Sequence, residues 1–484
     1  MPYTIPKEWA LTRIGVICGS IVPNRDKPKS FSGGFPWITL SNFSDKDIKL
    51  LRNHTGLGLS QEEVIKFNAR IIPSKSVLMS CVGRFGLVAV LEQDVVANQQ
   101  IHGFVAPSFL CPEYVAYVIK AHTQFLESSA TSTTVSYLNK TRCESIPFPL
   151  PPLAEQKRIV EKVDELMALC DRLAAAKQTR DDLRQKLRGS AIAALMNAET
   201  DEALEKSWAI VRDDWQTISQ DPKDVDGLRK SVLQLAARGK LVSQDTEDEA
   251  AAQLLQKAIR EKALMAQAGL IPKPRQSSPI SEDECPFPLP SSWEWVRLED
   301  ICSHIVDCLH RTPKYQHEGY PAIRTSEMRP GKILFEQARK VGREDYEMQT
   351  QRLVPKAGDV FYSREGSFGI AAVVPEGVEM CLSQRMMQFR AVSEVNPHFF
   401  SWVMNSSVMY RQASRDVVGM TVPHVNIRSL KEFVFPLAPY AEQKRIVAKV
   451  DELMQMCDQL EESLRQSQQR AEALAASAIS HLTI

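Results

Sequence analysis

The chain has 484 residues, of which 44% are hydrophobic and 24% are charged, and its formal net charge is zero. This length predicts more than one domain, and the balanced charge excludes a protein that binds nucleic acid through a large excess of basic residues. No apolar run approaches the roughly 18 residues that a membrane span needs, so we expect a cytoplasmic protein with no membrane partner.

The charge is nearly balanced in each region as well. Residues 1–147 carry fifteen Lys and Arg against eleven Asp and Glu, and residues 285–440 carry eighteen against seventeen. Electrostatic attraction to DNA is therefore weak and local, and tight binding requires help from other polypeptides. The ten cysteines form no CxxC pair and none lies at zinc-finger spacing from a histidine, so the sequence predicts neither a metal site nor a disulfide framework.

One segment occurs twice. Residues 148–173 read FPLPPLAEQKRIVEKVDELMALCDRL and residues 435–460 read FPLAPYAEQKRIVAKVDELMQMCDQL, with only six differences. Weaker matches continue upstream, where the stretch from Ile5 to Cys18 corresponds to the stretch from Leu289 to Cys302. A repeat of this kind indicates two halves built to one plan.

Each half begins with a compact α+β domain, over residues 1–147 and 291–434. Short apolar runs at 77–80, 87–91, 360–362 and 370–374 are bounded by glycines and read as buried strands. A helix follows in each half, starting at Pro112 and at Pro397, where proline is tolerated at the first helical position.

Each domain is followed by a long helix, over residues 148–200 and 435–484. An apolar seam with steps of three and four runs along both helices, which is typical of a coiled coil. Neither helix hides such a stripe alone, so we expect the two to pack on each other as an antiparallel coiled coil with pseudo-twofold symmetry. The predicted seam consists of Ile159, Val163, Leu166, Cys170 and Leu173 and, in the second helix, Ile446, Val450, Leu453, Cys457 and Leu460.

Two further regions separate the halves. Residues 201–270 are charged and helical in pattern, whereas residues 271–290 are rich in Pro and Ser and predict a linker at the domain boundary.

Two short motifs suggest catalysis, but each has a simpler explanation. Asn396-Pro397-His398-Phe399 resembles the motif with which amino-methyltransferases hold an adenine, yet Cys111-Pro112-Glu113-Tyr114 occupies the same frame in the other half, which indicates a helix start capped by Asn396. Glu155-Gln156-Lys157 and its copy at Glu442 fit part of a nuclease motif, but they open a helix, where Glu is favoured by the dipole. The sequence contains no P-loop, HExxH or GxSxG motif. It therefore predicts no catalytic residue and no metal.

Polar loop residues that differ between the halves are the better candidates. Arg, Asn and Gln pair bidentately with guanine or adenine edges, and each good pair gives roughly 1–3 kcal/mol of discrimination. In the first half the candidates for DNA contact are Trp37, Thr39, Ser41, Asn42, Ser80, Arg84, Gln99, Gln100, Thr133, Thr134, Tyr137 and Asn139. In the second half they are Arg324, Ser326, Tyr362, Ser363, Arg364, Glu365, Gln384, Arg385, Thr421, His424, Asn426 and Arg428.

The chain resembles the specificity subunit of a type I restriction-modification enzyme over essentially its whole length. The resemblance is carried by PLPPLAEQKRIVEKVDEL and its copy PLAPYAEQKRIVAKVDEL, by LRKSVLQLAARGKLV at 228–242, and by ISEDECPFPLPSSWEWVRL at 280–298. It implies two target recognition domains, each of which reads one half of an asymmetric bipartite site in double-stranded DNA. It further implies a non-catalytic chain without cofactors.

The resemblance also implies the partners of the chain. Two modification subunits would methylate adenine with S-adenosylmethionine, and restriction subunits would translocate and cut DNA with ATP and Mg. Two other interpretations stay open from the residues alone: a chain with its own methyltransferase or nuclease activity, and an interaction scaffold with two decorated ends. The bases that are read and the spacer between them do not follow from the sequence.

Overall fold

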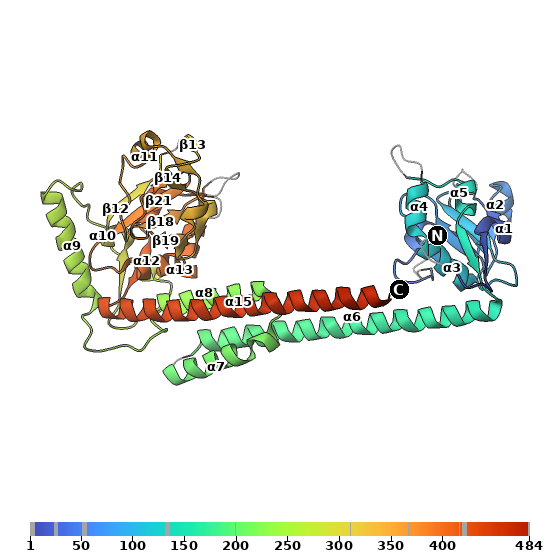
Figure 1. The fold of residues 1–484 in the computed structure, drawn as a ribbon, viewed down its shortest axis with the longest axis horizontal. Coiled ribbons are helices and arrows are strands. Elements are labelled where there is room, and N and C mark those ends of the chain that lie inside the picture. Colours follow the sequence, from blue (N-terminus) through green and yellow to red (C-terminus); the bar gives the residue numbers. More distant parts are fainter. Residues whose placement is uncertain are drawn as a thin grey trace. The chain divides into compact units, whose positions relative to one another are not determined.

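The computed structural model describes residues 5–23, 28–50, 56–130, 136–198, 200–309, 311–365, 368–415, 417–418 and 424–482 (Figure 1). It divides into two compact units, Met1–Gln178 and Thr179–Ile484, which are described separately below. No described helix is both long enough and apolar enough to cross a membrane.

The first unit contains two four-stranded sheets. In one sheet, β2 (Gly19–Ile21), β9 (Ile101–Val105), β6 (Val77–Ser80) and β7 (Val88–Val90) lie side by side in that order and are antiparallel. In the other the order is β4 (Gly58–Leu59), β3 (Phe35–Ile38), β8 (Val95–Ala97) and β5 (Ile71–Ile72). A separate pair joins β1 (Ala10–Arg13) to β10 (Pro147–Leu150). The helical elements are α1 (Ile14–Ile17), η1 (Leu40–Asn42), α2 (Gln61–Lys66), α3 (Pro112–Ala121), α4 (Thr123–Ser129) and α5 (Lys140–Glu144).

The second unit repeats the first of these sheets in full and the second in part. Its first sheet has the order β12 (Cys302–Asp307), β21 (Met386–Ala391), β18 (Val360–Ser363) and β19 (Ala371–Val373), and its second has β13 (Tyr315–Gln316), β17 (Lys340–Val341), β14 (Tyr320–Ile323) and β20 (Cys381–Leu382). Three two-stranded pairs are β11 (Glu294–Arg297) with β24 (Val434–Leu437), β15 (Met328–Arg329) with β16 (Lys332–Ile333), and β22 (Val417–Val418) with β23 (His424–Val425). The helical elements of this domain are α10 (Leu298–Ile301), η4 (Thr325–Glu327), η5 (Phe335–Gln337), α11 (Arg343–Gln349), α12 (Pro397–Met404), α13 (Ser407–Arg415) and α14 (Ile427–Lys431).

The two domains share the strand order of the first sheet and the register of the parallel pair in the second sheet, whose remaining edge strands, β5 and β13, lie on opposite edges. In the first, β3 and β8 are parallel and pair Trp37 with Val96, and in the second β14 and β20 are parallel and pair Ala322 with Cys381. Every other strand pair in the two main sheets of each domain is antiparallel. The doubled plan that the sequence predicts is therefore confirmed for the first sheet and for the central strands of the second.

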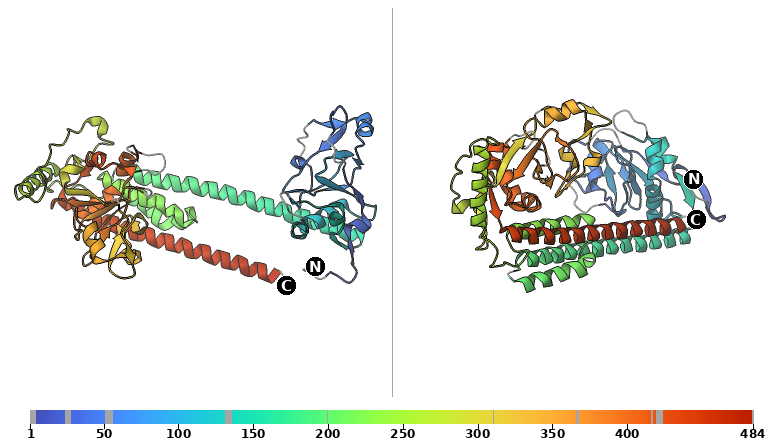
Figure 2. Two further views of the ribbon diagram at one scale, coloured as in Figure 1. Left: turned by 90° about the horizontal axis from the view of Figure 1, so that it is seen from above. Right: turned by 60° about the vertical axis from the view of Figure 1, so that its left-hand side comes forward.

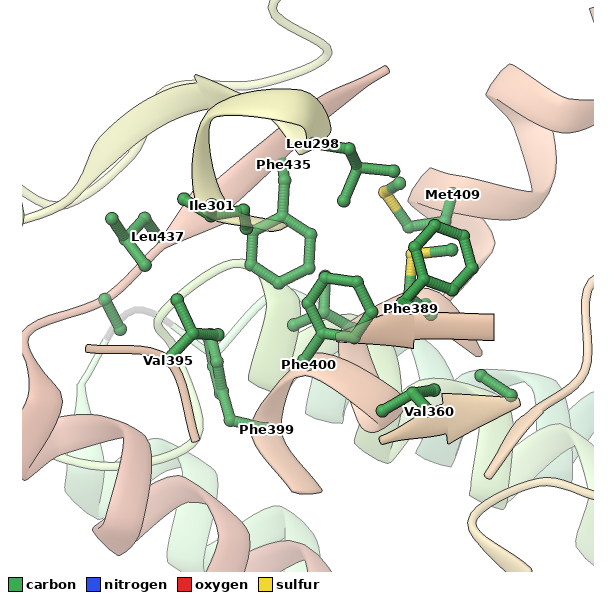
Figure 3. Packing of buried hydrophobic residues seen from close by; sticks show 14 of the residues in the cluster. Leu298, Ile301, Val360, Phe389, Val395, Phe399, Phe400, Met409, Phe435 and Leu437 are labelled. Atoms are coloured by element: carbon green, nitrogen blue, oxygen red, sulfur yellow. The ribbon is translucent and has the colours of Figure 1, made fainter. Parts of the chain in front are cut away.

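A core of aromatic residues holds the sheet of the second domain to its helices and to the start of its long helix (Figure 3). The rings of Phe400 and Phe435 stack at 5.3 Å, and Phe389 and Phe399 pack against Phe400 and Phe435, respectively. Phe148 is fully buried at the place of Phe435 in the first domain, where it contacts Tyr114 edge-on. Both copies of the FPL segment therefore anchor a long helix in a core.

The long helices are α6 (Leu153–Met196) and α15 (Tyr440–Leu482), with 44 and 43 residues. The stripe of α15 is buried from Ile446 to Cys457, and its main partner within the second unit is α8 (Val225–Ala237), which lies alongside it (Figure 1 and Figure 2). Ile446, Val450 and Leu453 share a core with residues of α8 and α12, whereas Cys457 meets α7 (Asp201–Ile218), the start of α8 and the end of α6. The prediction that the seam of α6 packs on that of α15 joins the two units and stays a prediction.

The equivalent stripe of α6 is far less covered. Ile159 and Val163 are half-buried, Cys170 is exposed, and Leu166 and Leu173 are 48% and 61% exposed.

The region between the halves belongs to the second domain. Residues of α8 and α9 (Ala251–Gln267) are part of the same core as Trp293 and Phe399, and α9 lies along the flank of that domain beside α10 (Figure 2). Residues 271–290 contain only the short η3 (Glu282–Glu284) between loops, but they are not a free linker. The Arg297 guanidinium, 4% exposed, binds the carbonyls of Ser278 and Pro279 and the carboxylate of Glu284. The predicted boundary at 271–290 is therefore an ordered strap on the second domain.

Candidate nucleic-acid interface

Four loops meet at one edge of the first domain, at the end of the central strand β6. The backbone N–H of Asn98 donates to Ile38 at 3.0 Å, which ties the turn after β8 to the loop after β3. Cys81 donates to the carbonyl of Gln100 at 2.9 Å and accepts from the N–H of Leu138 at 2.8 Å. The loops that carry the predicted residues are thus held together by main-chain hydrogen bonds, although they are far apart in the sequence.

The second domain forms the same edge at the end of β18. Ser383 donates to Ile323 at 2.8 Å, Arg364 donates to Arg385 at 3.1 Å, and Val425 donates to Arg364 at 3.1 Å. These bonds correspond one for one to those of the first domain. We call the two sets of four loops the first and second loop edges.

The first loop edge has two kinds of predicted residue. Trp37, Asn42 and Ser80 are buried and hold the loops in place; the Asn42 side chain, for example, accepts from the N–H of Thr39 at 2.9 Å. The others are accessible or form caps that leave part of the side chain exposed. They are Thr39, Ser41, Arg84, Gln99, Gln100, Tyr137 and Asn139, which caps α5. Arg84 forms an exposed ion pair with Asp45 at 2.8 Å.

The second loop edge divides in the same way. Tyr362 and Ser363 are fully buried, and the Ser363 hydroxyl accepts from the N–H of Ile370. Glu327 stands at the place of Asn42. Its buried carboxylate binds the Arg324 guanidinium and so holds this basic group at the loop. Residues with accessible polar atoms are Arg324, Ser326, Glu365, Gln384, Arg385, Asn426, which caps α14, and Arg428.

Three of the predicted residues, Thr133, Thr134 and Thr421, lie outside the described residues, as does the side chain of His424.

A chain of alternating charges crosses the second loop edge. Arg352 pairs with Asp307, Asp307 lies 3.6 Å from Arg364, Arg364 lies 3.2 Å from Glu365, and Glu365 lies 3.5 Å from Arg385. Sequence reasoning missed Asp307 and Arg352, because neither lies in a stretch that the repeat aligns with a loop. The sequence shows only that Asp307 is a charged residue at the end of a predicted strand and that Arg352 is a charged residue before a turn that contains proline.

The AEQK motifs form structural joints. Gln156 is fully buried, accepts from the N–H of Cys111 at 2.9 Å and donates to the carbonyl of Pro151. Gln443 makes the equivalent bonds with Asn396 and Ala438. The middle residue of the apparent nuclease motif therefore attaches a long helix to the start of α3 or α12.

The acidic residue of the second AEQK motif is also engaged in hydrogen bonds within the protein. Glu442 is fully buried and accepts from the indole N–H of Trp293 at 2.9 Å and from the side chain of Gln244 at 2.7 Å. Burial raises the pKa of Glu442, and these two hydrogen bonds oppose the rise. Among the described residues, no three or more His, Cys, Asp and Glu side chains are grouped so as to hold a metal ion.

The methyltransferase-like motif is a helix cap. The Asn396 side chain accepts from the N–H groups of His398 and Phe399 at 2.9 and 3.2 Å, as an N-cap does. Its carbonyl oxygen is thereby engaged with the backbone of α12.

Comparison with known proteins assigns the family. The family described as type I restriction modification DNA specificity domain matches residues 6–180 and 290–468. The specificity subunit of the type I restriction enzyme EcoAI of Escherichia coli is 30% identical over 345 residues, which are 69% of this chain and 58% of that protein. The EcoEI specificity subunit of the same species is 28% identical over 342 residues, 67% of this chain and 56% of that protein.

The chain thus spans less than two thirds of the length of these two relatives. A crystal structure of the HsdS subunit from Thermoanaerobacter tengcongensis is 19% identical, covers 97% of this chain and 96% of its own, and superposes with a TM-score of 0.44. The family match covers both α+β domains and both AEQK joints. The chain therefore belongs to the family of type I restriction modification DNA specificity domains.

Proposed function

We propose that this chain selects the DNA sequence on which a type I restriction-modification complex acts. Each loop edge reads one block of a bipartite site in double-stranded DNA. The observation that supports this most directly is that the two edges share one main-chain frame but carry different side chains, such as Cys81 at the place of Arg364. Because the side chains differ, we expect the two blocks to differ and the site to be asymmetric.

We further propose that the chain is not itself catalytic. S-adenosylmethionine, ATP and Mg would be bound by partner subunits: two modification subunits that methylate adenine, and restriction subunits that cut. Among the described residues of the loop edges, the accessible ones include base-reading types but form none of the catalytic arrangements that methyl transfer or hydrolysis uses. The near-neutral charge of both domains also favours partners that supply part of the phosphate neutralisation. We expect the complex to act in the cytoplasm.

Selection from a randomised DNA duplex tests the proposal. The full chain, assembled with a modification subunit, is incubated with the library, and bound molecules are sequenced. We expect two short enriched blocks separated by a gap of fixed length. Enrichment of no sequence would contradict the proposal, as would methyl transfer to DNA by the isolated chain.

A further inference from the structure

The row of alternating charges at the second loop edge includes two acidic residues, Asp307 and Glu365. Base reading by arginine does not require them, so their presence suggests a further role. Arg352, Asp307, Arg364, Glu365 and Arg385 come from four segments: the end of β12, the loop before β18, the end of β18 and the turn before β21. Three guanidinium groups share two carboxylates, so most of the positive charge at this edge is neutralised within the protein.

The three arginine side chains of this charged row differ in solvent exposure. The Arg364 side chain is 10% exposed and lies between the two carboxylates, with Asp307 near Nη1 and Glu365 near Nη2. Its Nε is buried, and no acceptor lies within hydrogen-bond distance of it in the part of the chain that the structure describes. The Arg352 and Arg385 side chains are 45% and 52% exposed. Arg364 therefore tethers the two acids, while Arg352 and Arg385 present the guanidinium groups that DNA can reach.

Arg385 is further restrained by its backbone. It has a φ of +67°, a left-handed conformation that a residue with a side chain adopts rarely, and its carbonyl accepts the N–H of Arg364. The direction in which its side chain leaves the turn is thus set by the fold, and Glu365 holds the end of that side chain.

Carboxylates beside such arginines act differently on phosphates and on bases. A phosphate carries a full negative charge and is repelled by Asp307 and Glu365, whereas the acceptor edge of guanine is uncharged and tolerates them. Phosphate contacts carry no sequence information, and specificity is a difference between affinities. Acidic residues that weaken phosphate contacts therefore increase the difference in affinity between the correct DNA sequence and all other sequences.

We propose that Asp307 and Glu365 are specificity-determining residues of the second loop edge, which orient Arg352 and Arg385 toward bases and disfavour their binding to phosphate. This rests on the proposed function of the loop edge. The first loop edge has no counterpart of the charged chain among its described residues: Cys81 stands at the place of Arg364, and Arg84 pairs with Asp45 with side-chain exposures of 66% and 54%. The effect is thus confined to the block that the second domain reads.

The test compares Glu365→Gln with the wild-type full chain, assembled with its modification subunit. Two quantities are measured: sequence enrichment from a randomised duplex, and affinity for a duplex of unrelated sequence over a series of salt concentrations. For the variant we expect about three- to tenfold tighter binding to unrelated DNA and a slope of log K against log salt that steepens by about 1. Preference should weaken in the second block and stay unchanged in the first.

Glu347→Gln is the matched control. Glu347 lies on α11 of the same domain and pairs with Arg343 at 2.9 Å, with both side chains exposed, so this variant removes the same charge from an ion pair outside the charged chain. An equal gain in affinity for unrelated DNA in Glu347→Gln would overturn the proposal, because the effect would then be one of net charge. If Glu365→Gln fails to fold, Asp307→Asn is measured in the same way.

Two other results would also overturn the inference. If Glu365 itself reads cytosine, the variant loses preference at one base pair without any gain in affinity for unrelated DNA. If enrichment and affinity both match wild type, the acids have only a structural role. Failure of the wild-type chain to enrich any sequence would instead contradict the proposed function, so the two failures are distinguishable.

Discussion

The side-chain oxygen of Gln443 accepts a hydrogen bond from the backbone N–H of Asn396 at 2.7 Å, and so connects the first turn of α15 to the start of α12. The same glutamine donates to the carbonyl of Ala438, so one buried amide bonds with two segments at once. Gln156 does this for Cys111 and Pro151 in the first unit. The near-identity of the two AEQK motifs follows from this shared joint.

We predict that Gln443→Leu destabilises the second domain by about 1–3 kcal/mol, because it leaves a buried N–H and a buried carbonyl without partners. Hydrogen exchange should become faster at the amide of Asn396 and stay unchanged at Cys111. Gln156→Leu should show the opposite pattern. Equal exchange at both sites in either variant would contradict the joint.

The buried His102 makes the first domain sensitive to acid. Burial lowers the pKa of His102 to about 4, the Lys140 charge acts in the same direction, and the Glu144 carboxylate opposes it. In the unfolded chain the pKa is near 6.5, so between pH 6.5 and 4 the unfolded state binds the extra proton and stability falls as the pH falls. We expect a loss of about 2–3 kcal/mol across this window.

The residues at the equivalent positions of the second domain suggest substitutions that test this pH dependence. His102 accepts or donates a hydrogen bond with Ser20 at 2.6 Å, and the register of the repeat places Met387 and Ile305 at the equivalent positions. The double variant Ser20→Ile and His102→Met should fold and should lose most of the dependence of Tm on pH between 4 and 6.5. An unchanged pH profile would show that other groups cause the loss.

The partner of the α15 stripe can be identified by truncation of side chains. Leu228 on α8 is fully buried with Cys457 and Leu464, so Leu228→Ala should cost about 2–5 kcal/mol. Leu173 on α6 is 61% exposed, and Leu173→Ala should change stability by less than about 0.5 kcal/mol. Urea unfolding of the full chain measures both. A small cost at Leu228 would contradict the packing of α8 on α15.

The loop edges predict separable effects on DNA. Arg385→Ala should relax base preference in the second block, and Arg84→Ala should do so in the first, each with roughly 1–3 kcal/mol of lost discrimination at the affected base pair. Selection from a randomised duplex, repeated for each variant, measures this. A uniform loss of affinity on all sequences would mean that the arginine contacts a phosphate.

Arg364→Ala distinguishes tethering from reading. We predict that preference relaxes within the second block, because Glu365 and Asp307 lose the group that lies between them. The double variant Arg364→Ala and Glu365→Gln should then behave like Glu365→Gln alone in the selection, since both act through the same contact. Additive losses would indicate that Arg364 itself contacts a base.

The repeat made much of the fold predictable from the amino-acid sequence. Because the segments around Ser80 and Ser363 align, their strands and the neighbouring loops can be matched from the sequence alone, and the hydrogen bonds of Cys81 and Arg364 bear out that match. The cap at Asn396 was predictable for the same reason.

Contacts between residues that no local pattern relates could not be predicted. The ion pair between Asp307 and Arg352 joins segments 45 residues apart. The packing of α8 on α15 likewise joins segments that lie far apart in the sequence. Three of the predicted DNA-contact residues, Trp37, Ser80 and Tyr362, are buried in the core. The residue type alone does not tell whether such a side chain is buried or accessible.

The hydrogen bonds that join the four loops of each edge run between main-chain N–H and carbonyl groups, as in Cys81 with Gln100 and Arg364 with Arg385. Any amino acid other than proline supplies these groups, so a substitution at an accessible position that neither caps a helix nor has a positive φ alters the surface and leaves these hydrogen bonds in place. Under the proposed function, mutation of these accessible positions can therefore change the target sequence at little cost to folding. A restriction-modification system that must change its marking pattern would gain from such a scaffold, because the main-chain hydrogen bonds stay the same while the accessible side chains vary.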